Sequence, residues 1–225
     1  MAKFEISGSV FKKYKGNDKE VEIPEGVTEI AEGAFLGCKK LTKIKLPEGL
    51  TEIGDVAFKD CHQLTELTIP DGVTKIGAGA FNFCTRLADI TLPDSVTEIG
   101  EIAFMGCDRL ASIILPDNLT EISESLFDGC SGLASIAIPE SVKKIGGSAF
   151  DSTPWLENNL AENTFLIING ILVGTAYLEG NVTLPDDVTA IGEDAFENCD
   201  ESVVITFRGK NYSYEDLDEL RETLN

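Results

Sequence analysis

The sequence repeats itself every 23 residues, and this period constrains the fold more than any other feature. Proline occurs at positions 24, 47, 70, 93, 116, 139 and 185, where the last gap equals two periods. Phenylalanine occurs at 35, 58, 81, 104, 127, 150 and 196, and cysteine at 38, 61, 84, 107, 130 and 199. A fixed period of this length predicts short units that stack into a solenoid, because one unit cannot bury its apolar face alone.

One unit, residues 64–84, indicates what each coil contains. Residues 64–69 are predicted to form a short strand, because their apolar side chains alternate onto one face. Pro70 ends that strand, since proline cannot donate to a β-ladder. A second extended piece is expected at residues 73–76, where β-branched residues gather. Residues 80–84 are interpreted as about one helical turn, with acids near its start.

Stacking would place equivalent side chains of successive coils over one another, so the seven phenylalanines are predicted to form one ladder in the core. The expected fold is a repeat solenoid of the β-rich α/β class, with about eight coils and parallel strands. In five coils a glycine follows the second extended piece: Gly54, Gly77, Gly100, Gly146 and Gly192. Ala31 and Ser123 occupy the same position in two coils, which favours close backbone approach over a left-handed conformation as the reason for the glycine.

The period indicates a single solenoid, 1–225, with two departures. Residues 1–23 are predicted to be an N-terminal hairpin cap, and residues 24–150 regular repeats. Residues 151–181 form an irregular insertion, in which Asn169-Gly170 predicts a second hairpin and Trp155 is expected to pack beneath it. One repeat follows at 182–200. Residues 201–225 are predicted to be a strand–helix cap, with an apolar helix face over the last coil.

The charge balance excludes some partners. The net charge is −21, from 39 acids and 18 bases. Nucleic acid and anionic membranes are therefore not expected as partners, because both are bound through lysine and arginine. The acidity fits either solubility or a cationic partner. No stretch approaches a membrane span, and the start, Met-Ala-Lys-Phe-Glu-Ile, lacks the apolar region of a signal peptide.

The repeat Leu-x-x-Ile-x-Leu-Pro-x-x-Val-x-x-Ile-Gly-x-x-Ala-Phe-x-x-Cys resembles the BspA-like bacterial leucine-rich repeats. The resemblance covers roughly residues 21–150 and 182–200. It implies a right-handed superhelix and a surface or secreted bacterial protein that contacts other proteins or host cells. It brings no catalytic residues and no cofactor. An intracellular location stays open, because this sequence shows no export signal or wall anchor.

Three sets of residues could carry chemistry, and each has a simpler reading. The six cysteines lie 23 or more apart, which disfavours a metal site and favours buried reduced thiols. His62, the only histidine, occupies a position expected to be exposed, and no nucleophile accompanies it. Acids follow the prolines at Glu25, Glu48, Asp71, Asp94, Asp117, Glu140 and Asp186. These fit solvated turns, or a calcium site between coils.

The open face of the main sheet is the candidate binding surface. Side chains alternate between the two faces along a strand, so nine of them are expected to point outward: Lys43, Lys45, Glu66, Thr68, Asp89, Thr91, Ser112, Ile114 and Ser135. They include no aromatic anchor of the kind that dominates binding energy. We expect a non-enzymatic module that binds a protein or glycan. The alternative is a structural spacer without a specific ligand.

Overall fold

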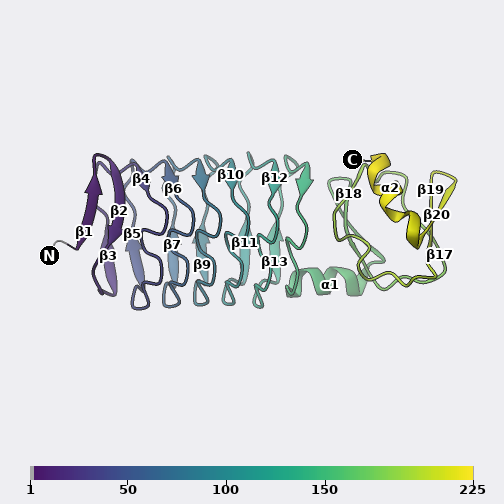
Figure 1. Ribbon diagram of the computed structural model, residues 1–225, viewed down its shortest axis with the longest axis horizontal. Helices are drawn as coiled ribbons and strands as arrows, with labels where there is room; N and C mark the ends of the chain where they lie inside the picture. Colours follow the sequence, from purple (N-terminus) through teal and green to yellow (C-terminus); the bar gives the residue numbers. More distant parts are fainter. Residues whose placement is uncertain (1–2, 225) are drawn as a thin grey trace.

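The computed structural model describes residues 3–224 and shows an elongated solenoid with parallel strands in two rows (Figure 1). Residues 1, 2 and 225 lie outside the described part, and with them the outer ends of the predicted caps 1–23 and 201–225. The main strand row consists of three-residue strands: β3 (Glu20–Glu22), β5 (Lys43–Lys45), β7 (Glu66–Thr68), β9 (Asp89–Thr91), β11 (Ser112–Ile114) and β13 (Ser135–Ala137). The second strand row consists of two-residue strands: β4 (Glu29–Ile30), β6 (Glu52–Ile53), β8 (Lys75–Ile76), β10 (Glu98–Ile99), β12 (Glu121–Ile122) and β14 (Lys144–Ile145).

The register between coils is one full period. In the main row Glu66 pairs with Asp89 and Leu67 with Ile90, and in the second row Glu52 pairs with Lys75. Pairing residues 23 apart keeps each apolar position over its equivalent. The strands are short because proline follows each main strand and removes a ladder donor.

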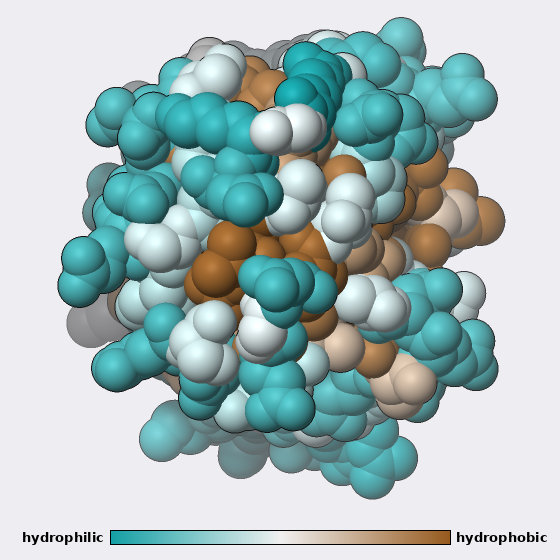
Figure 2. All heavy atoms as spheres, turned by 90° about the vertical axis from the view of Figure 1, so that its right-hand side faces the viewer, coloured by the Kyte–Doolittle hydropathy of each residue, from teal (hydrophilic) through white to brown (hydrophobic). Residues whose placement is uncertain are grey.

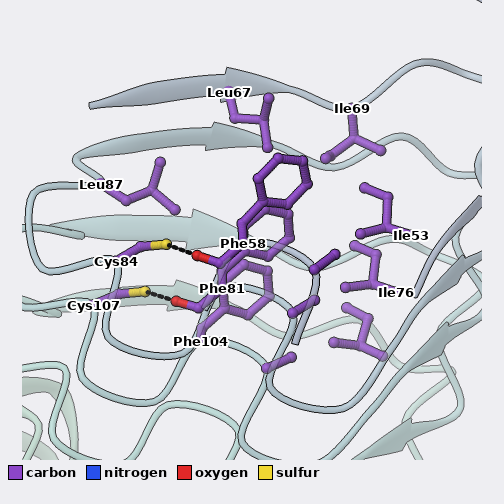
Figure 3. Packing of buried hydrophobic residues seen from close by; sticks show 14 of the residues in the cluster. Ile53, Phe58, Leu67, Ile69, Ile76, Phe81, Cys84, Leu87, Phe104 and Cys107 are labelled. Atoms are coloured by element: carbon purple, nitrogen blue, oxygen red, sulfur yellow. Dashed lines mark hydrogen bonds between the residues drawn. The ribbon is translucent and has the colours of Figure 1, made fainter. Parts of the chain in front are cut away.

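The core lies between the two rows and is built around stacked phenylalanine rings (Figure 3). Rings of Phe58 and Phe81 are 5.4 Å apart between centroids and only 1° from parallel, and Phe81 and Phe104 are also 5.4 Å apart. Fully burying one such ring contributes roughly 1.5–3 kcal/mol. The stack begins at Phe11 and continues through the phenylalanines of six coils: Phe35, Phe58, Phe81, Phe104, Phe127 and Phe150.

The prediction of one ladder of seven phenylalanines is wrong at its last member. The stack ends where Trp155 packs at a tilt on Phe150, with 4.7 Å between ring centroids. Phe196 belongs to a second apolar cluster, with Leu172, Leu184 and Leu220. The interruption arises because α1 (Pro154–Glu162) follows Phe150 at once, in place of another regular coil. Thr153 caps this helix by accepting a hydrogen bond from the Leu156 amide.

The two predicted hairpins are confirmed. At the N-terminal end β1 (Phe4–Ser7) pairs antiparallel with β2 (Val10–Tyr14), and β2 then pairs in parallel with β4. Further along, β15 (Phe165–Ile168) pairs antiparallel with β16 (Ile171–Thr175) across Asn169 and Gly170, both with positive φ. Trp155 belongs to α1 and packs on Phe150, and its place beneath the hairpin stays a prediction.

The C-terminal elements continue both rows for a short distance. They are β17 (Asn181–Thr183), β18 (Ala190–Ile191), β19 (Val204–Phe207), β20 (Lys210–Ser213), a single 3-10 turn (Tyr214–Asp216) and α2 (Leu217–Leu224). Strand β19 pairs with β17 in parallel and with β20 antiparallel. Leu217 and Leu220 of α2 are buried, so the predicted apolar helix face is confirmed. Viewed onto this end, the solenoid shows a mostly hydrophilic rim around a smaller apolar area (Figure 2).

The segment predicted as one helical turn is instead a pair of tight turns. In the six coils from Phe35 to Phe150 a residue with positive φ lies two positions before the phenylalanine, and Val56, Gly79 and Ile102 are examples. A second left-handed residue follows two positions after the phenylalanine, as at Asp60 and Phe83. Left-handed residues interrupt an α-helix, so the acids near this segment have no helix to cap.

Glycine after the second strand is explained by close backbone approach, as predicted. A Cβ added to Gly100 would lie 2.5 Å from the Ala78 amide nitrogen of the preceding coil, and one at Gly54 would lie 2.8 Å from the Glu32 amide nitrogen. Neither glycine has a positive φ. Ser123, which occupies this position in another coil, donates its hydroxyl to the Ile99 carbonyl at 2.6 Å.

Candidate binding face

The main strand row presents one face to solvent and the other to the core. In β5 and β7 the outer two residues are exposed and the central one is buried, and β11 follows the same pattern. The predicted outward set therefore lies on one open face, named here the main face: Lys43, Lys45, Glu66, Thr68, Asp89, Thr91, Ser112, Ile114 and Ser135. The structure brings these nine residues together, and their role in binding stays a prediction.

The N-terminal half of the main face is charged and slightly hollow. A depression of about 600 Å³ is lined by residues of β5, β7 and β9 and the turns that follow them. Across it, Lys43 forms an ion pair with Glu66 at 2.8 Å, and Lys45 forms one with Glu22 at 2.6 Å. These pairs are exposed, so they contribute little to the stability of the fold. Within the described part of the chain, Asp89 has no ion-pair partner.

The C-terminal half of the main face is uncharged. Ser112 and Ser135 pair in register, as do Ile114 and Ala137. Ile114 is 76% exposed, the highest value among the large apolar side chains that are exposed. Neighbouring small residues leave this side chain standing above the sheet, where a partner could cover it.

The cysteines are structural at four of their six positions. Each of these four thiols is buried and donates to the carbonyl of the phenylalanine in the preceding coil, as Cys84 does to Phe58 at 3.2 Å (Figure 3). All six cysteines are free. The prediction of six interior thiols is wrong for Cys38 and Cys199, which are half-buried, because each lies in a coil that borders a hairpin or an irregular segment.

His62 does not occupy the freely exposed position that was predicted. It is half-buried, and its Nδ1 atom lies 2.9 Å from the Phe83 carbonyl oxygen of the next coil. The acids that follow the prolines lie in turns, as at Glu48 and Asp71. Within residues 3–224, no three side chains of histidine, cysteine, aspartate or glutamate are grouped so that they could hold a metal ion.

A second depression, of about 740 Å³, lies where the regular repeats meet the C-terminal elements. Its lining carries both signs of charge, with Glu121, Glu193, Lys144 and Arg221 among the residues. Lys144 forms an ion pair with Glu121 at 2.6 Å, and the Arg221 guanidinium donates to the Glu193 carbonyl. Two of its cations, Lys144 and Arg221, are thus engaged within the protein, so this depression is a weaker candidate than the main face.

Comparison with known proteins shows to which family the repeat belongs. Six copies of the BspA type leucine rich repeat region match this chain, over residues 5–101, 51–179 and 167–216. This chain belongs to the BspA-type leucine-rich repeat family. Such repeats occur in bacterial surface proteins and generally serve as protein-interaction modules. No curated protein matches the chain.

Solved structures agree with this assignment. A leucine rich cell surface protein from Faecalibacterium prausnitzii is 31% identical, with a TM-score of 0.65 over 93% of this chain and 54% of that protein. A leucine-rich repeat protein of T. pallidum is 29% identical, with a TM-score of 0.60 over 71% of this chain and 91% of that one. The chain thus spans about half of the F. prausnitzii protein. No helix in residues 3–224 is long and apolar enough to cross a membrane.

Proposed function

We propose that the chain is a non-enzymatic interaction module of a bacterial surface or secreted protein, and that its main face binds a protein or glycan partner. The observation that carries the proposal is the open face itself, on which nine outward side chains line up over five strands. A solenoid needs only its inward side chains to fold, so this outward row is free to evolve for recognition.

Two parts of the main face suit different contacts. The depression over β5, β7 and β9 offers charged and hydroxyl groups, among which the Asp89 carboxylate has no ion-pair partner in the described part of the chain. Ile114 offers an exposed apolar side chain three coils away from Lys45. A partner that covers both would bury the isoleucine and gain polar contacts at the depression. That division supports a macromolecular partner rather than a small molecule.

The second candidate function is a spacer that displays other parts of a longer protein. It is favoured by one observation: both lysines of the main face are already ion-paired, Lys43 with Glu66 of the same face and Lys45 with Glu22 of the adjacent strand β3. A face whose charges are satisfied internally has less to offer a partner. A spacer would tolerate any substitution there that leaves the fold intact.

The test is capture of a partner by the intact protein from a protein and glycan array, repeated with variants. Reversal of charge at Glu66 and Asp89, together with Ile114→Asp, should abolish capture by the main face. The matched control reverses Glu98, which pairs with Lys75 in the second strand row. Equal loss in both, or no specific capture by the wild-type protein, would favour the spacer.

A further inference from the structure

The five residues that follow each ladder phenylalanine form one edge of the solenoid, and the charge of this edge changes sign along its length. In the first four coils the edge comprises residues 36–40, 59–63, 82–86 and 105–109, named here the basic edge. It carries five bases, Lys39, Lys40, Lys59, Arg86 and Arg109, and two acids, Asp60 and Asp108. The equivalent positions in later coils hold no base and five acids: Asp128, Asp151, Glu197, Asp200 and Glu201. A surplus of positive charge is unexpected in a chain of net charge −21.

The bases of this edge are free to meet a partner. Lysines on the two strand rows are ion-paired, as Lys75 is with Glu98 at 2.9 Å. In contrast, within residues 3–224 the four bases Lys39, Lys40, Lys59 and Arg109 form no ion pair. Arg86 donates to the side-chain oxygen of Gln63 at 2.9 Å, which leaves its charge unneutralised.

An exposed aromatic side chain lies in the middle of these bases. Phe83 is 41% exposed and its backbone has φ of 55°. That left-handed conformation costs a non-glycine residue roughly 1–2 kcal/mol. Glycine occupies the equivalent position in three other coils, at Gly37, Gly106 and Gly129. Asp60 and Ser152 occupy the same left-handed position in two further coils, so the repeat does not need a phenylalanine here and its ring is free to serve another role.

The ring of Phe83 is held in place rather than loosely exposed. A Cβ added to Gly106, one coil further on, would lie only 2.5 Å from the ring, so the phenylalanine packs flat against that glycine. Its own carbonyl oxygen lies 2.9 Å from His62 Nδ1. One coil earlier than His62, the Leu36 side chain is 46% exposed on the same edge. Aromatic side chains and arginine are enriched in protein–protein interfaces, and this edge combines Phe83 with Arg86 and Arg109.

We propose that the basic edge docks an extended acidic segment of a partner protein, with an apolar side chain of that segment packed against Phe83. Coils are about 4.8 Å apart, so four coils span roughly 14 Å, the length of four or five extended residues. Carboxylates spaced along such a segment would face the unpaired bases, and charge complementarity would set its register. This surface is separate from the main face, so the proposal goes beyond the proposed function.

The proposal is tested with an array of short synthetic peptides in which glutamate alternates with each apolar residue type. Binding to the intact protein is measured by fluorescence anisotropy. Phe83→Gly should weaken binding at least tenfold while the unfolding midpoint stays unchanged or rises, because glycine is native to this position in other coils. Combined Lys59→Gln and Arg86→Gln should weaken binding similarly and reduce its salt dependence. Lys143→Gln, off both the basic edge and the main face, is the matched control and should change nothing.

Several results would overturn the proposal. One is unchanged affinity in Phe83→Gly, and another is the absence of binding by every acidic peptide. Equal binding of peptides in which lysine replaces glutamate would remove the charge argument. Loss of binding in Ile114→Ala alone would move the site to the main face. Self-association of the protein that Phe83→Gly abolishes would identify the occupant as a second copy, and tight binding of an oligonucleotide would identify a nucleic acid.

Discussion

The Cys84 thiol donates a hydrogen bond of 3.2 Å to the carbonyl oxygen of Phe58, one coil earlier. The same bond recurs from Cys61, Cys107 and Cys130 to the phenylalanine of the coil before each. The cysteine is thus small enough to pack beside the aromatic stack, and it supplies a second donor to a carbonyl that already accepts from a backbone amide, as Phe58 does from Cys61 at 3.1 Å. Thr153, which replaces cysteine in one coil, also donates to a phenylalanine carbonyl, that of Phe150 at 2.6 Å.

Thiol reactivity should divide the cysteines into two groups. Burial raises the pKa of Cys84 and Cys130 to about 12, and it raises the pKa of Cys107 well above the ordinary value. The neighbouring Cys61 thiol, and then Lys13, hold the pKa of Cys38 below its ordinary value. Titration with a thiol reagent at about pH 8 should therefore label Cys38 first and Cys199 next. The other four should react only after denaturation.

Mass spectrometry of the labelled peptides identifies each site. Cys38→Ser is the control and should remove the fast phase alone. Rapid labelling of Cys84 or Cys107 in the folded protein would contradict their place in the core.

Alanine substitutions should separate the two reasons for glycine in the repeat, which are a positive φ and a close approach of the neighbouring backbone. Gly79→Ala should cost about 1 kcal/mol, because Gly79 has φ of 60° while space for a Cβ is only slightly short. Gly100→Ala should cost more, since its Cβ would lie 2.5 Å from backbone atoms of the neighbouring coil. Gly49→Ala is the control, as nothing lies within 4 Å of its added Cβ, and it should be neutral or stabilising. Denaturant unfolding measures all three, and an equal cost at Gly49 and Gly100 would refute the close-approach explanation.

The carboxyl group of Asp128 should make stability depend on pH in a defined direction. Its pKa is raised from 3.8, first by burial and then by the charge of Asp151. An acid whose pKa is higher in the folded state destabilises that state increasingly as pH rises through the interval above about 4. Asp128→Asn should therefore raise the unfolding midpoint at neutral pH, and its advantage should vanish in acid. Asp200→Asn is the control: hydrogen bonds from Ser202 hold the pKa of Asp200 below its ordinary value, so this change should lower the midpoint at neutral pH instead.

The period was enough to predict the stacked strands, and local turn and apolar patterns predicted both hairpins and the apolar helix at the C-terminal end. The period could not reveal α1, because the segment Pro154–Glu162 occurs once and its docking depends on Trp155 meeting Phe150. The left-handed position before each phenylalanine was also missed. It is filled by Val56, Ile102 and Ser125 as well as by glycine, so residue type gives no consistent signal.

The two candidate surfaces also differ in how far the sequence predicts them. Alternation along the strands predicts which residues lie on the main face, because side-chain direction in a strand has a period of two. The basic edge has no such period. The sequence marks it only by a departure from the repeat, a phenylalanine at position 83 where glycine is common. Only the structure gives the exposed fraction and the backbone angle that make this residue a candidate for binding.

The most direct test of the architecture compares two phenylalanines that lie two positions apart. Phe81 is fully buried between Phe58 and Phe104, whereas Phe83 is 41% exposed. The measurement is the free energy of unfolding of Phe81→Ala and Phe83→Ala in denaturant. Phe81→Ala should lose about 3–5 kcal/mol by leaving a cavity in the stack, and Phe83→Ala should lose less than about 1 kcal/mol. Equal losses, or a near-neutral Phe81→Ala, would contradict the stacked phenylalanine core.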